Sequence, residues 1–150
     1  MTHRETKTGH QQKSTLDKIM GLNPQGKNPQ EKYKTVPFDS KKYTTITSDS
    51  KEYPYLLKHI EKPPNPLYAL GNTALLNQPC VAVVGTRKPT KEGKTAAKNI
   101  AKFYGVNGFI IVSGLALGVD SISMKAALKA GAPVIGVLPS SLDNIVPRKN

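Results

Sequence analysis

Two short glycine-containing segments carry the residues of this chain that could do chemistry. The first, VGTRKPT, runs from Val84 to Thr90, and the second, SGLALGVD, runs from Ser113 to Asp120. Small residues beside hydroxyl and guanidinium groups are typical of an anion site, because the backbone can approach an oxyanion closely and an arginine fork matches its oxygens. The residues predicted to bind phosphate are Gly85, Thr86, Arg87, Lys88, Lys91, Lys94, Ser113 and Gly114.

The roles expected within this site differ. Gly85 allows a sharp turn, Thr86 offers a hydroxyl, and Arg87 presents a planar donor fork, while the following helix aims its N–H groups inward. A small anion and a nucleic-acid phosphate both fit such a site. In the alternative interpretation, the glycines only permit tight turns and Arg87 points into solvent.

Each segment follows an apolar run that predicts a buried strand. These runs are CVAVV (Cys80 to Val84) and FIIV (Phe109 to Val112), and a third, PVIGVL (Pro133 to Leu138), follows the second helical pattern. Strands that alternate with helices predict an α/β fold, a Rossmann-like open and mainly parallel sheet with flanking helices. Ligands of such sheets bind outside the carboxyl ends of the strands, where both glycine segments are expected.

Two helices are predicted between these strands. Thr90 is expected to cap the first, with an apolar stripe of Ala96, Ala97, Ile100, Ala101 and Tyr104 and a stop at Gly105 and Gly108. Its lysines, Lys91, Lys94, Lys98 and Lys102, indicate either a solvated face or an extension of the basic surface around Arg87. The second helix is expected to bury Ile122, Ala126 and Ala130 and to end at Gly131.

The part before Cys80 has weaker patterns. Residues 1–43, rich in Lys, Thr, Gln, Asn and Ser, predict a disordered basic tail, and residues 44–150 predict the folded domain. TTITS (Thr44 to Ser48) has weak strand character, and a short amphipathic helix is expected after Pro54, with Tyr55, Leu56 and Ile60 on one side. LYAL (Leu67 to Leu70) is predicted as a further strand of the sheet.

The charge of the chain favours a polyanionic partner. The net charge is +12, and residues 51–150 hold 13 Lys and Arg against 5 Asp and Glu, so most of the excess lies in the predicted domain. Nucleic acid or an acidic membrane surface would attract such a protein, although a basic surface kept for solubility is the alternative.

Several other classes are disfavoured by the sequence. Cys80, the single cysteine, is expected in the core, the three histidines are scattered away from other metal ligands, and no cofactor or metal is expected. No signal peptide or membrane-spanning run is visible, which predicts a cytoplasmic protein.

The sequence also lacks a complete motif of the enzyme classes that it partly resembles. Gly93-Lys94-Thr95 imitates the end of a P-loop, but Lys88 occupies its required first glycine, and neither segment spells GxGxxG. Asp120 is expected to cap the second helix, without a partner for acid–base catalysis. The sequence therefore predicts a protein that is not an enzyme.

Four ordered blocks carry a family resemblance. They are YPYLLKHIEKPPNPLYALGN, AVVGTRKPT, IVSGLALGVDSISMKAAL and IGVLPSSLDNIVPRKN, and between residues 48 and 150 they resemble the Rossmann-like domain of the DprA/Smf family of DNA-processing proteins. The resemblance implies binding and protection of single-stranded DNA and loading of a RecA-type recombinase during DNA-mediated transformation and recombination. It also implies that Arg87, Ser113 and Gly114 line a pocket for DNA phosphates.

The chain departs from the family pattern in two respects. Leu117 stands where the family often has Arg, and Met124 stands where it often has His. Family members also continue with further strands, which predicts a shortened product, a poorly folding fragment, or a relative completed by a partner chain or a homodimer. PVIGVL is therefore expected to be either an exposed sheet edge or an interface with another chain.

Two alternative functions remain from the sequence. One is binding of a nucleotide or small phosphorylated ligand, possibly with glycosidic-bond hydrolysis that relies on Asp120. The other is an inactive, truncated remnant.

Overall fold

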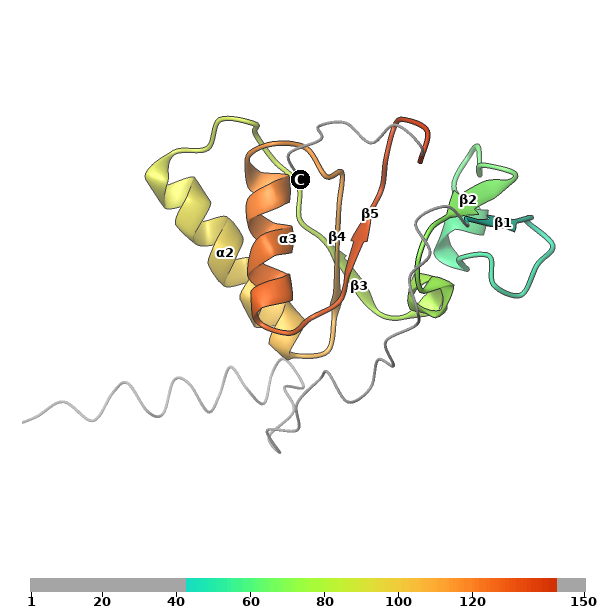
Figure 1. The fold of residues 1–150 in the computed structure, drawn as a ribbon, viewed down its shortest axis with the longest axis horizontal. Coiled ribbons are helices and arrows are strands. Elements are labelled where there is room, and N and C mark those ends of the chain that lie inside the picture. The colour runs from blue at the N-terminus through green and yellow to red at the C-terminus, as the bar shows by residue number, and fades with distance from the viewer. Residues whose placement is uncertain (1–42, 143–150) are drawn as a thin grey trace, which may run out of the picture.

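A three-stranded parallel sheet with two helices on one face forms the larger part of the computed structural model, which describes residues 43–142 (Figure 1). The strands are β3 (Cys80–Ala82), β4 (Ile110–Ser113) and β5 (Val134–Gly136), in the order β3-β4-β5. Helix α2 (Lys91–Val106) connects β3 to β4, and α3 (Val119–Lys129) connects β4 to β5. The predicted α/β class and parallel order are confirmed.

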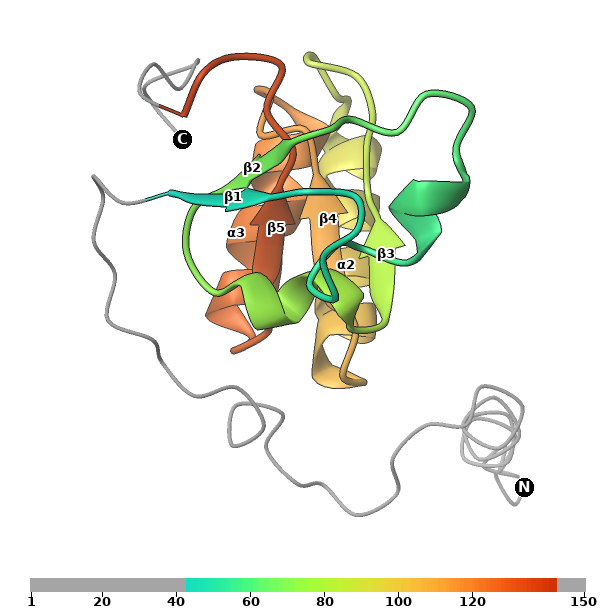
Figure 2. The same ribbon diagram turned by 90° about the vertical axis from the view of Figure 1, so that its right-hand side faces the viewer.

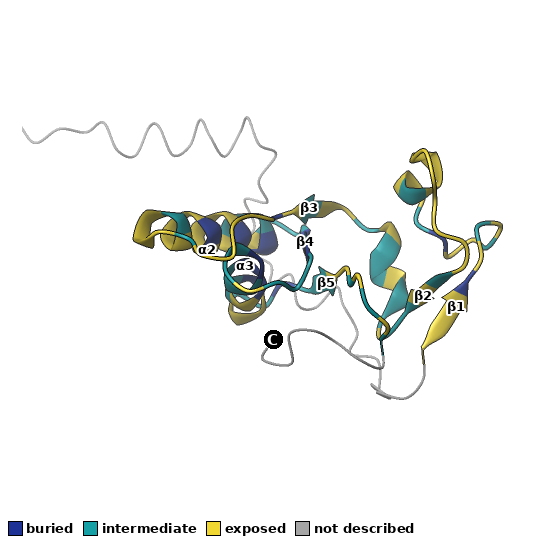
Figure 3. Ribbon diagram, turned by 90° about the horizontal axis from the view of Figure 1, so that it is seen from above, coloured by how far each residue is buried: buried dark blue, intermediate teal, exposed yellow. Residues whose placement is uncertain are grey.

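Small side chains bring the two helices together over this sheet. The core consists of Val83, Ala101, Ile111, Ala127 and Ala132. Helix α2 presents Gly105 to the chain after α3, and a Cβ at Gly105 would lie only 2.6 Å from the Cβ of Ala132. Figure 3 shows that buried positions gather where α2 and α3 face each other and the sheet, with exposed residues on their outer side.

A small N-terminal unit lies over the opposite face of the sheet (Figure 2). Strand β1 (Thr44–Ile46) pairs antiparallel with β2 (Leu67–Ala69), and two 3₁₀ turns, η2 (Leu56–His59) and η3 (Thr73–Asn77), complete the unit. Ile46 and Tyr53 are buried, and the Tyr53 hydroxyl donates to the Pro64 carbonyl at 2.6 Å. The strand expected from LYAL therefore exists, but its expected place in the parallel sheet was wrong, because it pairs with β1.

The helix expected after Pro54 is only the 3₁₀ turn η2. Tyr55, Leu56 and Ile60 are exposed, so they form no buried apolar side. The Tyr55 N–H donates to Asn77 Oδ1 at 2.9 Å, and a proline-rich stretch follows Ile60. Proline prevents helical continuation, so the segment stops after one turn.

The buried faces of the two long helices differ in part from the prediction. Ala97 and Ala101 of α2 are buried as expected, whereas Ala96 and Ile100 are exposed. Helix α3 buries Ser123, Met124 and Ala127, and the expected Ile122, Ala126 and Ala130 are half-buried. The buried face of α3 is rotated because this helix must pack against α2 as well as against the sheet.

The remaining predictions concern the sheet edges and the chain ends. Cys80 is exposed rather than buried in the core, because it begins the edge strand β3; its thiol lies 3.1 Å from the Gln78 carbonyl, and partial desolvation raises the thiol pKa. Strand β5 has β4 as its only sheet partner among residues 43–142, so PVIGVL is an edge within this range. Nearly all of the expected tail and the last eight residues lie outside the described residues.

Two classes of feature are absent from the described range. Between residues 43 and 142, no helix is long and apolar enough to cross a bilayer. In the same range, no three His, Cys, Asp or Glu side chains gather closely enough to hold a metal ion.

Candidate functional site

The two predicted glycine segments meet at the carboxyl ends of β3 and β4. The loop after β3 contacts the start of α3, where the Val119 N–H donates to the Thr86 carbonyl at 3.1 Å. Gly118 allows this approach: a Cβ there would lie 2.3 Å from the Thr86 oxygen and 2.6 Å from the Arg87 Cα. The backbone of Arg87 is therefore held against the N-terminus of α3.

The Asp120 carboxylate connects the two strand ends through hydrogen bonds from backbone N–H groups. Its Oδ1 accepts from the Gly85 N–H at 3.3 Å, and its Oδ2 accepts from Gly114 at 3.1 Å and Ala116 at 3.4 Å. The sequence predicted that Asp120 caps α3, and this prediction was wrong. The N-cap is Gly118, and Asp120 lies in the first turn of the helix. It is 5% exposed and connects the two segments into one structure.

We call the region formed by residues 85–88 and 113–114 at these strand ends the crevice. Ser113 and Gly85 make contacts inside the protein there. Ser113 is 2% exposed, and its hydroxyl donates to the Val83 carbonyl at 2.7 Å. Val83 is the first residue after β3, so this bond extends the connection between the strands beyond their ladder. A Cβ at Gly85 would lie 2.9 Å from the Val119 side chain, so glycine is required for packing on α3.

The polar surface of the crevice comes from the residues after Gly85. Thr86, Arg87 and Lys88 are exposed, and the Thr86 hydroxyl accepts from the Lys88 N–H at 3.2 Å, which shapes the turn. Within residues 43–142, no acidic group forms an ion pair with Arg87. The guanidinium is therefore available to an external anion, and the backbone that carries it is fixed by α3.

The N-terminus of α2 is occupied by the protein itself. Thr90 caps the helix as predicted and accepts from the Gly93 N–H at 3.2 Å. Glu92 lies in the first turn, and hydrogen bonds from its own N–H and from Thr90 lower the pKa of its carboxyl. A carboxylate already complements the dipole at this end, so the expectation that α2 aims free N–H groups at the ligand was incomplete.

Removing this carboxylate is expected to strengthen anion binding. Glu92→Gln should tighten binding of an oligo-dT by roughly two- to fivefold at pH 7, because the substitution removes a negative charge from the first turn of α2, close in sequence to Arg87. Since the Glu92 pKa is lowered in the folded protein, wild type keeps this charge until the pH falls below the usual glutamate range. The advantage of the variant should therefore vanish only in more acidic solution, as measured by fluorescence anisotropy.

Glu61→Gln provides the matched control. Glu61 is exposed in the N-terminal unit, between η2 and β2, and its substitution changes the net charge equally. Equal gains from both variants would contradict a local role for Glu92.

The second segment has an unusual backbone. Leu115 has a φ of +57°, a conformation that bulky residues rarely adopt, and such strain is concentrated at functional loops. Leu117, at the position where the family often has Arg, is 49% exposed, whereas Met124 is buried. The Leu117 side chain thus adds an apolar spot, not a charge, to the surface next to Gly118.

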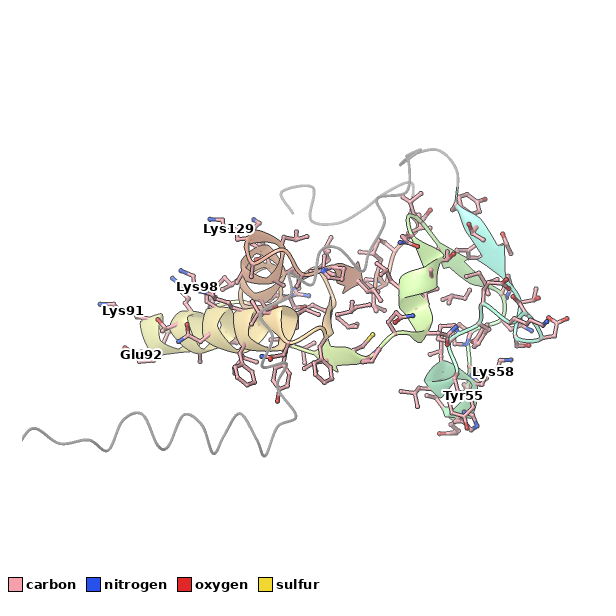
Figure 4. The ribbon with its side chains drawn as sticks, turned by 90° about the horizontal axis from the view of Figure 1, so that it is seen from below. Tyr55, Lys58, Lys91, Glu92, Lys98 and Lys129 are labelled. Atoms are coloured by element: carbon pink, nitrogen blue, oxygen red, sulfur yellow. The ribbon has the colours of Figure 1, made fainter. Side chains whose placement is uncertain are left out.

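The three predicted lysines follow Arg87 in the chain. Lys88 is exposed on the loop after Arg87, and Lys91 and Lys94 are exposed on the first turns of α2. Figure 4 shows Lys91 at the end of α2, pointing away from the sheet. Gly85, Thr86, Arg87, Ser113 and Gly114 are brought together by Asp120 and α3, and the lysines extend the positive charge outward.

A large apolar cavity of about 1430 Å³ lies elsewhere, between the helix-free face of the sheet and the N-terminal unit. Tyr55, Leu56, Cys80, Val112 and Ile135 are among its lining residues, and no charged side chain of the described range lines it. A cavity of this chemistry does not attract phosphate. The strand ends are the better candidate because exposed cations lie there on backbone that Gly118 and Asp120 contact.

Three contributors to the site were missed by the sequence interpretation. Gly118, Glu92 and the tying role of Asp120 all depend on contacts across the fold. The only local signal was the order Gly-Val-Asp at the start of the second helix, which indicates a turn but not its partner.

Comparison with known proteins gives one family. Residues 44–150 match the model of the DNA recombination-mediator protein A family. DNA processing protein DprA of Bacillus subtilis is 42% identical over 117 residues, which cover 77% of this chain and 36% of the relative. Protein Smf of Synechocystis is 39% identical over 101 residues, covering 65% and 25% respectively. The chain thus spans well under half the length of these curated relatives.

Two solved structures share the fold. The X-ray structure of DNA processing protein A from Streptococcus pneumoniae matches with a TM-score of 0.68 and 36% identity, over 73% of this chain and 38% of the other. DNA processing protein A from Helicobacter pylori, described for its single-stranded DNA binding mode, matches with a TM-score of 0.60 and 38% identity, over 72% and 47%.

Proposed function

This chain belongs to the DNA recombination-mediator protein A family, and from that premise we propose that it binds single-stranded DNA in the crevice at the ends of β3 and β4. The observation that carries the proposal is Arg87, which is exposed and forms no ion pair with any other residue between 43 and 142, on a backbone that Gly118 and Asp120 hold in place. A relative of the same fold is described as binding single-stranded DNA.

In the proposed mechanism, binding is driven by phosphate contacts. Arg87 donates from its planar fork to phosphate oxygens, and Lys88, Lys91 and Lys94 neutralise neighbouring phosphates. The Ser113 hydroxyl is already bonded to the Val83 carbonyl, so it does not donate to phosphate. Ser113 and Gly114 therefore only shape the crevice. Release of counterions makes this binding tolerant of sequence and strongly dependent on salt.

Base stacking contributes little in this mechanism. The rings of Phe103, Tyr104 and Phe109 stack on one another edge to face, with centroids 5.3 and 5.6 Å apart. They lie where α2 ends and β4 begins, at the opposite end of α2 from Arg87. The crevice therefore holds the strand mainly by its backbone.

The proposed role is non-enzymatic. The Asp120 carboxylate accepts three backbone N–H bonds and is buried, so it has no free oxygen directed at a ligand. This geometry disfavours the alternative of a glycosidic-bond hydrolase. On the family alone, we propose that the bound strand is protected and passed to a RecA-type recombinase, and that a second protein chain or copy pairs with the β5 edge.

The binding proposal is tested by substitution of Arg87. Arg87→Ala should weaken binding of a labelled oligo-dT by about tenfold and reduce the slope of log affinity against log salt by roughly 0.7, because the variant neutralises one phosphate fewer. Arg87→Lys should keep the salt slope but lose part of the affinity, since lysine lacks the planar fork.

Lys62→Ala is the control for net charge. Lys62 is exposed in the N-terminal unit, away from both glycine segments. Fluorescence anisotropy across a salt series measures all three variants. If Lys62→Ala and Arg87→Ala weaken binding equally, the proposed site is incorrect.

A further inference from the structure

A second basic surface lies on the outer side of the helix pair. It consists of Lys98 and Lys102 on α2 and Lys125 and Lys129 on α3, all exposed, and we call it the helix-pair lysine surface. Figure 4 shows Lys91, Lys98 and Lys129 pointing to the same side, away from the sheet. This surface is separate from the loops that carry Arg87.

No acidic side chain of these two helices compensates the four charges. Glu92 is the only acidic residue of α2, and it is engaged with Thr90 and its own backbone at the N-terminus. Asp120 is the only acidic residue of α3 and is buried beneath the crevice. Within residues 43–142, none of the four lysines forms an ion pair, so their full charge faces solvent.

The surface is also without rings that could stack on bases. The aromatic residues of α2, Phe103 and Tyr104, are half-buried and stack on each other and on Phe109. A ligand at the four lysines is therefore held by charge alone. Single-stranded DNA therefore gains no stacking free energy there that duplex DNA lacks.

The spacing of the lysines suits a nucleic-acid backbone. Lys91 and Lys94 precede Lys98 and Lys102 on α2. At 1.5 Å per residue, the helix rises about 16 Å from Lys91 to Lys102, which corresponds to roughly five phosphates of one duplex strand at 3.4 Å each. A duplex also carries about one charge per 1.7 Å of axis when both strands are counted. A surface that offers only charge gains more from this density than from a single strand.

We propose that the helix-pair lysine surface binds the phosphate backbone of double-stranded DNA. Lys91 and Lys94, at the start of α2, connect this surface to Arg87, so a duplex on the helices would adjoin a single strand in the crevice. The chain would then hold a junction between paired and unpaired DNA. The inference rests on the proposed function only in taking DNA as the ligand.

The test is a triple variant with a charge-matched control. Lys98→Gln, Lys102→Gln and Lys129→Gln should together reduce the salt slope for a blunt 20-base-pair duplex by about 2.7, at roughly 0.9 for each phosphate that is no longer neutralised. The control combines Lys51→Gln, Lys58→Gln and Lys62→Gln, which remove the same charge from the N-terminal unit. Both variants are checked by circular dichroism and melting temperature.

The expected result separates the two DNA forms. The helix-pair variant should lose most duplex affinity, while its affinity for oligo-dT falls no further than in the control; Arg87→Ala should do the reverse. The inference is overturned if wild type does not bind duplex, if the slope is unchanged, or if both triple variants lower it equally. Failure of wild type to bind oligo-dT would refute the proposed function and leave this test unaffected.

Discussion

Gly118→Ala is expected to destabilise the protein by about 2–6 kcal/mol. Gly118 has a φ of +87° and a ψ of −130°, which an L residue adopts only with about 1–3 kcal/mol of strain. The new methyl would also lie 2.3 Å from the Thr86 carbonyl oxygen and 2.6 Å from the Arg87 Cα. Both atoms belong to backbone, so the loop must move, and overpacking of this kind adds about 1–3 kcal/mol.

Thermal unfolding measures this effect, and Gly108→Ala is its control. Gly108 has nearly the same φ, +86°, but a Cβ there would meet nothing within 4 Å. The control should therefore suffer only the strain, whereas Gly118→Ala should melt roughly 8 °C or more below wild type. Similar melting temperatures for the two variants would show that the close approach to Thr86 and Arg87 has no energetic weight.

Asp120→Ala is the second substitution expected to have a large effect. It leaves the N–H groups of Gly85, Gly114 and Ala116 without their acceptor in a partly buried region, and hydrogen bonds to a charged group contribute about 1.5–3 kcal/mol each. Because these bonds are 3.1–3.4 Å long, we expect the free energy of unfolding to fall by about 3 kcal/mol in total. DNA binding should fall as well, since both segments lose their common anchor.

Asp120→Asn and Asp49→Asn distinguish the loss of these Asp120 hydrogen bonds from a general effect of removing one negative charge. An amide at position 120 keeps one acceptor oxygen but turns an NH₂ group toward an N–H donor, so it should lose part of the stability that alanine loses. Asp49 is in the N-terminal unit, far in sequence from both glycine segments, and its amide variant should melt close to wild type. Chemical denaturation checks the series; an Asp120→Asn protein as stable as wild type would contradict this role of the hydrogen bonds.

The parallel sheet and both long helices could be predicted because their signals are local. Apolar runs of four or five residues alternate with helical patterns, Thr90 caps α2, and Gly131, with a φ of +79°, follows α3. Each of these features depends on neighbours within a few residues. The position of Arg87 beyond the end of β3 follows from the same order of elements.

The errors arose where distant segments decide the structure. LYAL pairs with β1, about twenty residues earlier, instead of the parallel sheet, and nothing local distinguishes these partners. The buried face of α3 depends on packing against α2, and Cys80 is exposed because β3 is at the edge of the sheet formed by residues 43–142. An apolar residue in a strand is buried only if something covers its face.

The anion site stays a prediction, and residue types did not indicate the contacts that its residues make inside the protein. Arg87 is exposed, as an anion-binding residue must be, yet Ser113 uses its hydroxyl inside the protein and Asp120 ties loops 35 and 6 residues away in sequence. Glu92 reduces the attraction of α2 for anions because it occupies the helix end itself. These assignments need the three-dimensional partners, which residue types do not specify.

Binding of single-stranded DNA at Arg87 is tested by titrating isotope-labelled protein with oligo-dT and following the amide and arginine side-chain NMR signals. The largest shifts are expected at the Arg87 guanidinium and at the amides of Gly85, Thr86 and Gly118, and they should decrease together as salt is added. Shifts confined to the N-terminal unit, or to residues outside 43–142, with the Arg87 signals unchanged, would contradict it.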